Sequence, residues 1–196
     1  MFKLSILIPT IEGREASFNE LYMQIQNAIW YFGLTASVEV LYLKDDKEIT
    51  IGEKREKLYA MASGEYAWQI DDDDSIPWEA IPKILEAIEI APADCITFEE
   101  ACTIDGVQSR SNFSIHYPDW ADNVFGYDHV RTPFFKTPIL TSICRQVPVP
   151  HVRFGEDHLW AQAIKSLLKS ETHIPLPLYH YNHTSSPHNE RYGITE

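Results

Sequence analysis

Four consecutive aspartates, Asp71 to Asp74, are the residues whose type and spacing most clearly predict chemistry. They follow Tyr66 to Ile70, an apolar stretch that we expect to be a buried strand. Adjacent carboxylates repel one another unless a cation gathers them. Oxygen ligands suit Mg²⁺ or Mn²⁺, which leave coordination positions open for phosphate oxygens. The run therefore predicts a metal site, and a solvated acidic turn is the alternative.

Two other metal motifs can be compared with the run. A calcium-binding EF-hand loop starting at Asp71 would need glycine and glutamate where the sequence has Ile76 and Pro82, so that class is excluded. A phosphatase of the haloacid-dehalogenase type is compatible locally, with Asp71 as nucleophile and Asp73 as acid/base before Ser75. That alternative stays open.

A second acidic pair, Glu156 and Asp157, follows Gly155 at the start of a predicted helix. Carboxylates at a helix N-terminus are stabilised as anions, so ordinary capping is one interpretation. The pair also suits a general base held at the mouth of a pocket.

The first half of the chain predicts the elements that position these residues. Apolar runs alternate with amphipathic stretches in the order β-α-β-α-β-α-β, which is typical of an α/β fold with a largely parallel sheet between helices. The expected strands are 3–9, 37–43, 66–70 and 95–98, and the expected helices are 15–32, 51–62 and 77–91. Ligands bind beyond the carboxyl ends of such strands. The clusters 10–14, 45–46 and 71–74 lie there.

The second half predicts a different arrangement. Asp105-Gly106 indicates a hairpin turn between strands 101–104 and 107–115. Residues 117–153 are rich in loops, with one short helix expected from Thr137-Pro138 to Cys144. A helix is expected over 156–168, and then a strand from His173 that becomes a polar tail up to Glu196.

Composition limits the classes of protein. With 196 residues and 44% hydrophobic residues, we expect one globular domain, 1–196, with a ligand-binding half (1–100) and a second half (101–196). The three cysteines lack metal-ligand spacing, and the sequence has neither an apolar run long enough for a membrane span nor a signal peptide. We therefore expect a cytoplasmic protein. The net charge of −13 disfavours non-specific binding to polyanions, although residues 109–153 carry five basic residues against three acidic ones.

The ordered set of motifs resembles family 2 glycosyltransferases. It comprises Ser5–Thr10, Ile51–Leu58, Gly64–Asp74 and Gly155–Asp157. The resemblance implies a single A-type nucleotide-binding fold and inverting transfer from a nucleotide-diphosphate sugar. Two positions depart from the family pattern, because 45–48 is not the usual acidic-Gly-Ser segment and Glu56 stands where asparagine is common.

The resemblance also implies roles for single residues. Pro9 and Thr10 would line the nucleotide pocket, Asp45 or Asp46 would contact the base, and Arg55 would face the nucleotide. Asp73 would be the main ligand of Mn²⁺ or Mg²⁺, with Asp71 on metal or ribose. Asp72 is grouped with the nucleotide-sugar contacts, although it is also, like Asp74, a candidate for a structural role. Asp157, beside Glu156, would be the catalytic base.

Late histidines and one tryptophan complete the candidates. In many A-type enzymes a late histidine joins the metal, which makes His180 and His183 candidates, with His188 nearby. Surface histidines are the alternative. Among the tryptophans, Trp120 lies in the loop-rich segment and is a candidate acceptor contact, whereas Trp30, Trp68, Trp78 and Trp160 are expected mostly in the core.

The predicted reaction is a single displacement in which Asp157 deprotonates an acceptor hydroxyl. The acceptor stays open among a glycan, a lipid-linked intermediate, a small molecule and a modified nucleic acid. The phosphatase and a non-catalytic nucleotide-sugar-binding protein are the alternative functions.

Overall fold

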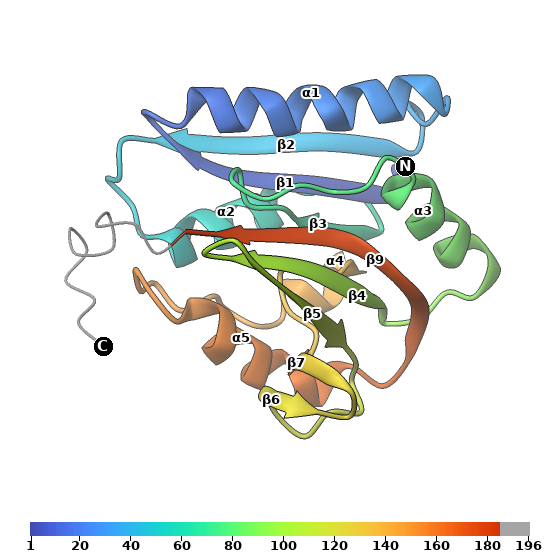
Figure 1. Cartoon of the computed structure of the whole chain (residues 1–196). Coiled ribbons are helices and arrows are strands. Elements are labelled where there is room, and N and C mark those ends of the chain that lie inside the picture. The colour runs from blue at the N-terminus through green and yellow to red at the C-terminus, as the bar shows by residue number, and fades with distance from the viewer. Residues whose placement is uncertain (185–196) are drawn as a thin grey trace.

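The computed structural model describes residues 1–184 of the chain. Within these residues one sheet runs in the order β2-β1-β3-β8-β4-β5-β7-β6, and β9 pairs with β4 (Figure 1). Its strands are β1 (Leu4–Ile11), β2 (Val38–Asp45), β3 (Tyr66–Gln69), β4 (Cys95–Ile104), β5 (Val107–Phe113), β6 (Ala121–Val124), β7 (Tyr127–Arg131), β8 (Ile139–Leu140) and β9 (Glu171–His183). The helices are α1 (Glu15–Tyr31), α2 (Ile51–Met61), α3 (Ala80–Ile90), α4 (Thr141–Cys144) and α5 (Glu156–Ile164), which a 3₁₀ turn over Lys165–Leu167 extends.

The first half forms the parallel part of the sheet. β1 pairs in parallel with both β2 and β3, so the carboxyl ends of the three strands meet at one edge. β1 is buried from Leu4 to Thr10, as expected for a β-branched and aliphatic run with a helix on each face. Figure 1 shows α1 on one side of these strands and α2 on the other. The predicted α/β class with a helix-flanked parallel sheet is confirmed.

Helices α2 and α5 pack against each other on one face of the sheet. The rings of Tyr59 in α2 and Trp160 in α5 stack with centroids 5.5 Å apart, and both side chains are buried. At the start of α2, the carbonyl oxygen of Pro150 lies so close to Gly52 that a Cβ there would be 1.8 Å from it. Glycine therefore allows the loop before α5 to lie against α2.

The second half differs from the prediction in its details. β4 runs unbroken to Ile104, so the strands expected at 95–98 and 101–104 are one strand. The hairpin turn is confirmed, because Asp105 and Gly106 both have positive φ, 51° and 79°. The loop-rich segment contains β6 and β7.

Two predicted helix starts were wrong. The short helix begins at Thr141 instead of Thr137-Pro138, because Ile139 and Leu140 form β8 between β3 and β4. α3 begins at Ala80, after a turn in which the amide of Ala80 bonds to the carbonyl of Pro77.

The last described strand, β9, occupies a central place. It pairs in parallel with β4 from Cys95 to Ile104, with register shifts beside Glu99. It begins at Glu171, two residues before the predicted start. His188 and most of the predicted polar tail lie outside the described residues.

Tryptophan burial separates the predicted core from the surface. Trp68 and Trp160 are fully buried, as expected, but Trp30 is 79% exposed and Trp78 is 38% exposed.

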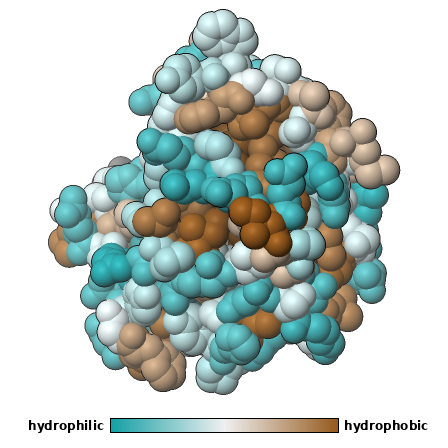
Figure 2. Space-filling view, turned by 90° about the vertical axis from the view of Figure 1, so that its right-hand side faces the viewer, coloured by the Kyte–Doolittle hydropathy of each residue, from teal (hydrophilic) through white to brown (hydrophobic). Residues whose placement is uncertain are grey.

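Figure 2 views the side at which β1 to β3 begin and shows apolar patches separated by polar side chains. No helix of residues 1–184 combines the length and apolar character that crossing a membrane requires.

Candidate functional site

Two hollows meet at the edge where the parallel strands end. The larger cleft, of about 400 Å³, is bounded by the end of β1, the start of α2, Asp71 to Asp73, and the loop leading into α5. The second cavity, of about 250 Å³, lies under β4, β5 and β7. Arg55, Asp71 and Asp157 line both hollows. These three residues mark the place where two ligands could meet.

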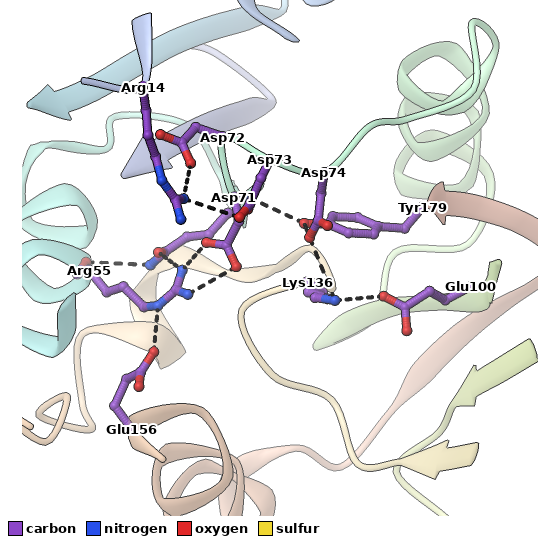
Figure 3. Close-up of polar contacts among 11 residues, drawn as sticks. Arg14, Arg55, Asp71, Asp72, Asp73, Asp74, Glu100, Lys136, Glu156 and Tyr179 are labelled. Carbon is purple, nitrogen blue, oxygen red and sulfur yellow. Dashed lines mark hydrogen bonds and ion pairs between the residues drawn. The ribbon is translucent and has the colours of Figure 1, made fainter. Parts of the chain in front are cut away.

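Arg55 of α2 contacts several acidic and polar side chains of the larger cleft (Figure 3). Its guanidinium lies 2.9 Å from Asp71 Oδ1 and 3.2 Å from Glu156 Oε1, and it donates to Gln69 Oε1 at 3.2 Å. Its other side faces the ring of Phe135 at 4.5 Å. Burial alone would lower the pKa of Arg55, but the two carboxylates more than offset this and raise it. Arg55 is therefore a fixed cation that joins the aspartate run to α5.

Asp72 is held from the opposite wall. Thr10 Oγ1 donates to Asp72 Oδ2 at 2.6 Å, and Arg14 Nη1 donates to Asp72 Oδ1 at 2.7 Å. Asp72 is only 2% exposed, so its carboxylate ties the run to the end of β1. The structure supports its alternative, structural role.

Asp73 is the carboxylate of the run that reaches furthest into solvent, with half of its side chain exposed. Arg14 Nη1 lies 3.1 Å from Asp73 Oδ2. Burial raises the pKa of Asp73, and the carboxylates of Asp71 and Asp72 raise it further, although Arg14 opposes them. Positive charge is thus favourable beside Asp73.

Asp74 points away from the cleft into a buried network (Figure 3). The hydroxyl of Tyr179 donates to Asp74 Oδ2 at 2.7 Å and accepts from the amide of Asp71 at 3.2 Å. Lys136 Nζ lies 3.7 Å from Asp74 Oδ2 and donates to Glu100 Oε1 at 2.9 Å. Burial raises the pKa of Asp74 to about 7. β9 thereby fixes the aspartate turn on the side that faces away from the cleft.

The two acids at the start of α5, Glu156 and Asp157, differ in burial and in their partners. Glu156 is buried against Arg55, and burial raises its pKa. Asp157 is partly exposed, and its Oδ1 accepts from the amide of His158 at 2.8 Å. The left-handed backbone of Gly155, φ 78°, turns the chain into the helix. Asp157 is therefore the member of the pair that faces both hollows.

Most of the predicted site residues come together. The larger cleft gathers Pro9, Thr10, Arg55, Asp71, Asp72, Asp73, Glu156 and Asp157. Trp120 lines the second cavity instead, where Arg131 lies 5.2 Å from its ring centroid.

Four predicted residues lie outside the two hollows. Asp45 pairs with Lys54, which does line the larger cleft, and Asp46 is exposed. His180 Nε2 lies 2.8 Å from Thr103 Oγ1, and the ring of His183 stacks on Tyr181. The backbone of His180 pairs with that of Ser75, the residue after the aspartate run, but within residues 1–184 neither histidine side chain forms a hydrogen bond or ion pair with the run. The histidines are thus placed for structural contacts of β9.

The sequence placed Arg14 in a candidate ligand cluster without a role of its own, and it assigned no role to Lys54, Lys136 and Tyr179. Lys136 bonds to a partner 36 positions away, and Tyr179 to one 105 positions away, so neither contact leaves a local pattern. A lysine directly after Phe134 and Phe135 is the one signal that the sequence offers for Lys136. A buried cation among aromatics needs an anionic partner.

The acidic residues can be tested for their fit to a divalent metal. Within residues 1–184, no three side chains of the His, Cys, Asp or Glu types are grouped to hold a metal by themselves. Asp71 and Asp73, however, supply oxygen donors at the mouth of the cleft, where repulsion between carboxylates favours added positive charge. These two carboxylates are oxygen donors of the kind that Mg²⁺ or Mn²⁺ prefers.

The fold also occurs in solved structures. Residues 1–349 of TarS from S. aureus share 15% identity with this chain, with a TM-score of 0.65 over 92% of this chain and 60% of that one. The same TarS fragment in complex with UDP-GlcNAc gives a TM-score of 0.67 at 14% identity, covering 96% and 61%. Its complex with UDP gives 0.65 at 16%, covering 97% and 63%.

These likenesses show the fold and confirm the predicted A-type architecture. The chain spans about 60% of the length of the TarS fragment. No family model matches the sequence, and no curated protein matches it.

Proposed function

We propose that this chain, which has the fold of TarS and a cleft lined by both cations and carboxylates at its strand ends, is a glycosyltransferase that uses a nucleotide-diphosphate sugar. The observation that carries the proposal is the shared lining of the two hollows by Arg55, Asp71 and Asp157. A donor in the larger cleft and an acceptor in the second cavity would meet at these side chains. TarS was solved with UDP-GlcNAc and with UDP, which makes a uridine diphosphate sugar the first donor to test.

The larger cleft suits a nucleoside diphosphate. Arg14, Lys54 and Arg55 place cationic groups around it, and Pro9 and Thr10 form its wall at the end of β1. Phosphate oxygens favour cations and partly desolvated donors, which this wall supplies. Asp45 or Asp46 remains the proposed base contact.

A metal ion belongs to the proposal. Asp73, with Asp71 beside it, would hold Mn²⁺ or Mg²⁺, and the ion would supply positive charge to the diphosphate leaving group. Arg55 fixes Asp71, Tyr179 fixes the backbone of Asp71, and Arg14 forms ion pairs with both Asp72 and Asp73. The protein thus holds the carboxylates in place before the donor arrives.

Asp157 would act as the general base. It would take the proton of the acceptor hydroxyl as that oxygen attacks the anomeric carbon from the side opposite the diphosphate, so the configuration would invert. Glu156 is committed to Arg55 and keeps α5 beside the cleft.

The test is a thermal-shift titration of the full chain with UDP-GlcNAc and a panel of other nucleotide sugars, each with MnCl₂ or with a chelator. A ligand that binds the folded state raises the melting temperature. We expect one nucleotide sugar to give a manganese-dependent shift that Asp73→Asn abolishes and that Glu89→Gln, an exposed acid of α3, retains.

Two results would contradict the proposal. Absence of a shift with every nucleotide sugar would refute the donor site. An equal shift with the chelator and in Asp73→Asn would refute the metal role. Release of phosphate from a generic phosphoester would favour the phosphatase instead, and a shift without turnover would favour a non-catalytic binding protein.

A further inference from the structure

The second cavity differs in chemistry from the larger cleft. Aromatic side chains form a large part of its lining, and they are Trp120, Phe134, Phe135 and Tyr181. Polar groups stand among them, including Glu100, Ser111 and His129. Its volume of about 250 Å³ is just below the range of about 300–1,000 Å³ that drug-sized ligands occupy. The cavity therefore suits one small ring with both apolar and hydrogen-bonding faces.

The charges of this lining are balanced. With histidine counted as neutral, the cations Arg55, Arg131 and Lys136 stand against the carboxylates Asp71, Glu100 and Asp157. The cations are also engaged, since Lys136 donates to Glu100 at 2.9 Å and Arg131 lies 2.9 Å from Asp122 Oδ1. An anionic ligand would have to compete with these carboxylates.

The basic stretch 109–153 does not form an anion site here. Arg110 pairs with Glu99 at 2.5 Å, and Arg145 donates to the backbone carbonyls of Tyr59 and Ala62 at the end of α2. The positive balance seen in the sequence is thus offset by acids and carbonyls from other segments. A phosphorylated acceptor therefore has little to attract it.

A neutral sugar ring matches all of these features. The C–H face of a pyranose packs on aromatic side chains, and its hydroxyls bond to carboxylates, serine and imidazole. We propose that the second cavity binds one neutral sugar ring of the acceptor, with its reacting hydroxyl at Asp157. This inference rests on the proposed function and narrows its acceptor to a glycan or small glycoside.

The transfer then balances in its atoms and electrons. The acceptor oxygen forms a bond to the anomeric carbon of the donor, and its proton passes to a carboxylate oxygen of Asp157. The bond from the anomeric carbon to the diphosphate oxygen breaks, and its electron pair leaves with the nucleoside diphosphate.

The experiment measures acceptor binding without any donor. Saturation-transfer NMR on the full chain would use the methyl glycosides of glucose, galactose, mannose and N-acetylglucosamine as neutral probes, with glucose 6-phosphate and glycerol phosphate as anionic ones. We expect at least one methyl glycoside to bind and its affinity to change little with added salt, because no net charge attracts it.

Variants of Trp120 locate the binding. Trp120→Leu is expected to weaken the glycoside about tenfold, since an aromatic contact contributes about 1.5 kcal/mol, and Trp120→Phe is expected to restore most of the affinity. Trp30→Leu, at an exposed tryptophan of α1, serves as the matched control. Circular dichroism shows whether each variant is folded.

The outcomes separate this inference from the proposed function. Failure of every methyl glycoside, binding of the phosphorylated probes alone, or unchanged affinity in Trp120→Leu would overturn the acceptor assignment. Glycoside binding that depends on Trp120 would support it, even if no nucleotide sugar shifted the melting temperature. That last result would refute only the donor half of the proposal.

Discussion

At the scale of single residues, the site contains five acids, some of which pair with arginines and some of which remain available to ligands. Asp71 and Glu156 neutralise Arg55, and Asp72 neutralises Arg14. Burying a charge is costly unless it is paired, so Asp72 and Glu156, which are 2% and 6% exposed, are committed to the protein. Asp71, Asp73 and Asp157 keep partial exposure toward the cleft and are the three available for ligands.

Asp157→Asn tests the base at this scale. The change keeps the size of the side chain but removes the group that accepts the proton. We expect kcat for transfer to fall by about 10²–10⁴-fold, the usual contribution of a general base, while the donor-induced thermal shift persists. A coupled assay of nucleoside diphosphate release measures kcat.

Glu20→Gln, an exposed acid of α1, is the control for that assay. Turnover of Asp157→Asn at the rate of this control would exclude Asp157 as the base.

At the scale of elements, β9 is the strand that fixes the aspartate turn. Its Tyr179 hydroxyl bridges the amide of Asp71 and the carboxylate of Asp74, and the amide of Asn182 donates to Asp74 Oδ1 at 2.9 Å. The turn is thus held by two residues of a strand that follows it by about one hundred positions. A strand far away in sequence sets the local geometry of the run.

Tyr179→Phe tests this dependence. Losing the hydroxyl leaves a buried amide and a buried carboxyl each short of a partner, which costs about 1–3 kcal/mol of unfolding free energy. We also expect a weaker manganese-dependent donor shift, because Asp71 loses an anchor. Urea unfolding measures the first effect, and Tyr31→Phe, at an exposed tyrosine, is the matched control. Equal stability and an equal donor shift in the two variants would argue against this role.

The junction of β1, β2 and β3 gives a pH-dependent prediction. Glu39 Oε1 accepts from Ser5 Oγ at 2.5 Å and from the amides of Ser63 and Gly64 at 2.5 and 3.1 Å. Burial alone would raise the pKa of Glu39, but these donors more than offset it and lower the pKa below its ordinary 4.5. The ionised form therefore stabilises the fold above that pH, and the contribution is lost as the pH falls through the lowered pKa.

Glu39→Gln should accordingly be less stable than the wild type at pH 7, with a difference that shrinks in acid. Urea unfolding of both proteins across this range gives the difference directly. Glu86→Gln, on the exposed side of α3, is expected to show no such trend. A difference that stays constant with pH would contradict the assignment.

At the scale of the whole molecule, the sequence predicted the half that local patterns determine. β1 and β3 are continuous buried runs, and α1 has a regular apolar face, so the spacing of their apolar residues could be recognised in the sequence. β6, β7 and β8 are short, and most residues of the first two are half-buried or exposed, so packing in the folded state decides whether these strands form.

The candidate site divides in the same way. Asp71, Asp73 and Asp157 could be proposed from motifs, but the positions of Arg14, Lys136 and Tyr179 depend on contacts between distant segments. Trp30 shows the converse error, because an apolar residue in a helical pattern was assigned to the core and lies exposed.

The place of Tyr179 has a consequence for biosynthesis. A ribosome adds residues in order, so Asp71 to Asp74 emerge long before the strand whose hydroxyl holds them. Until β9 has emerged and paired with β4, a nascent chain lacks the Tyr179 hydroxyl that bridges the amide of Asp71 and the carboxylate of Asp74. The growing polypeptide would therefore acquire its ligand-binding geometry late in translation, after its parallel strands β1 to β3 had all been made.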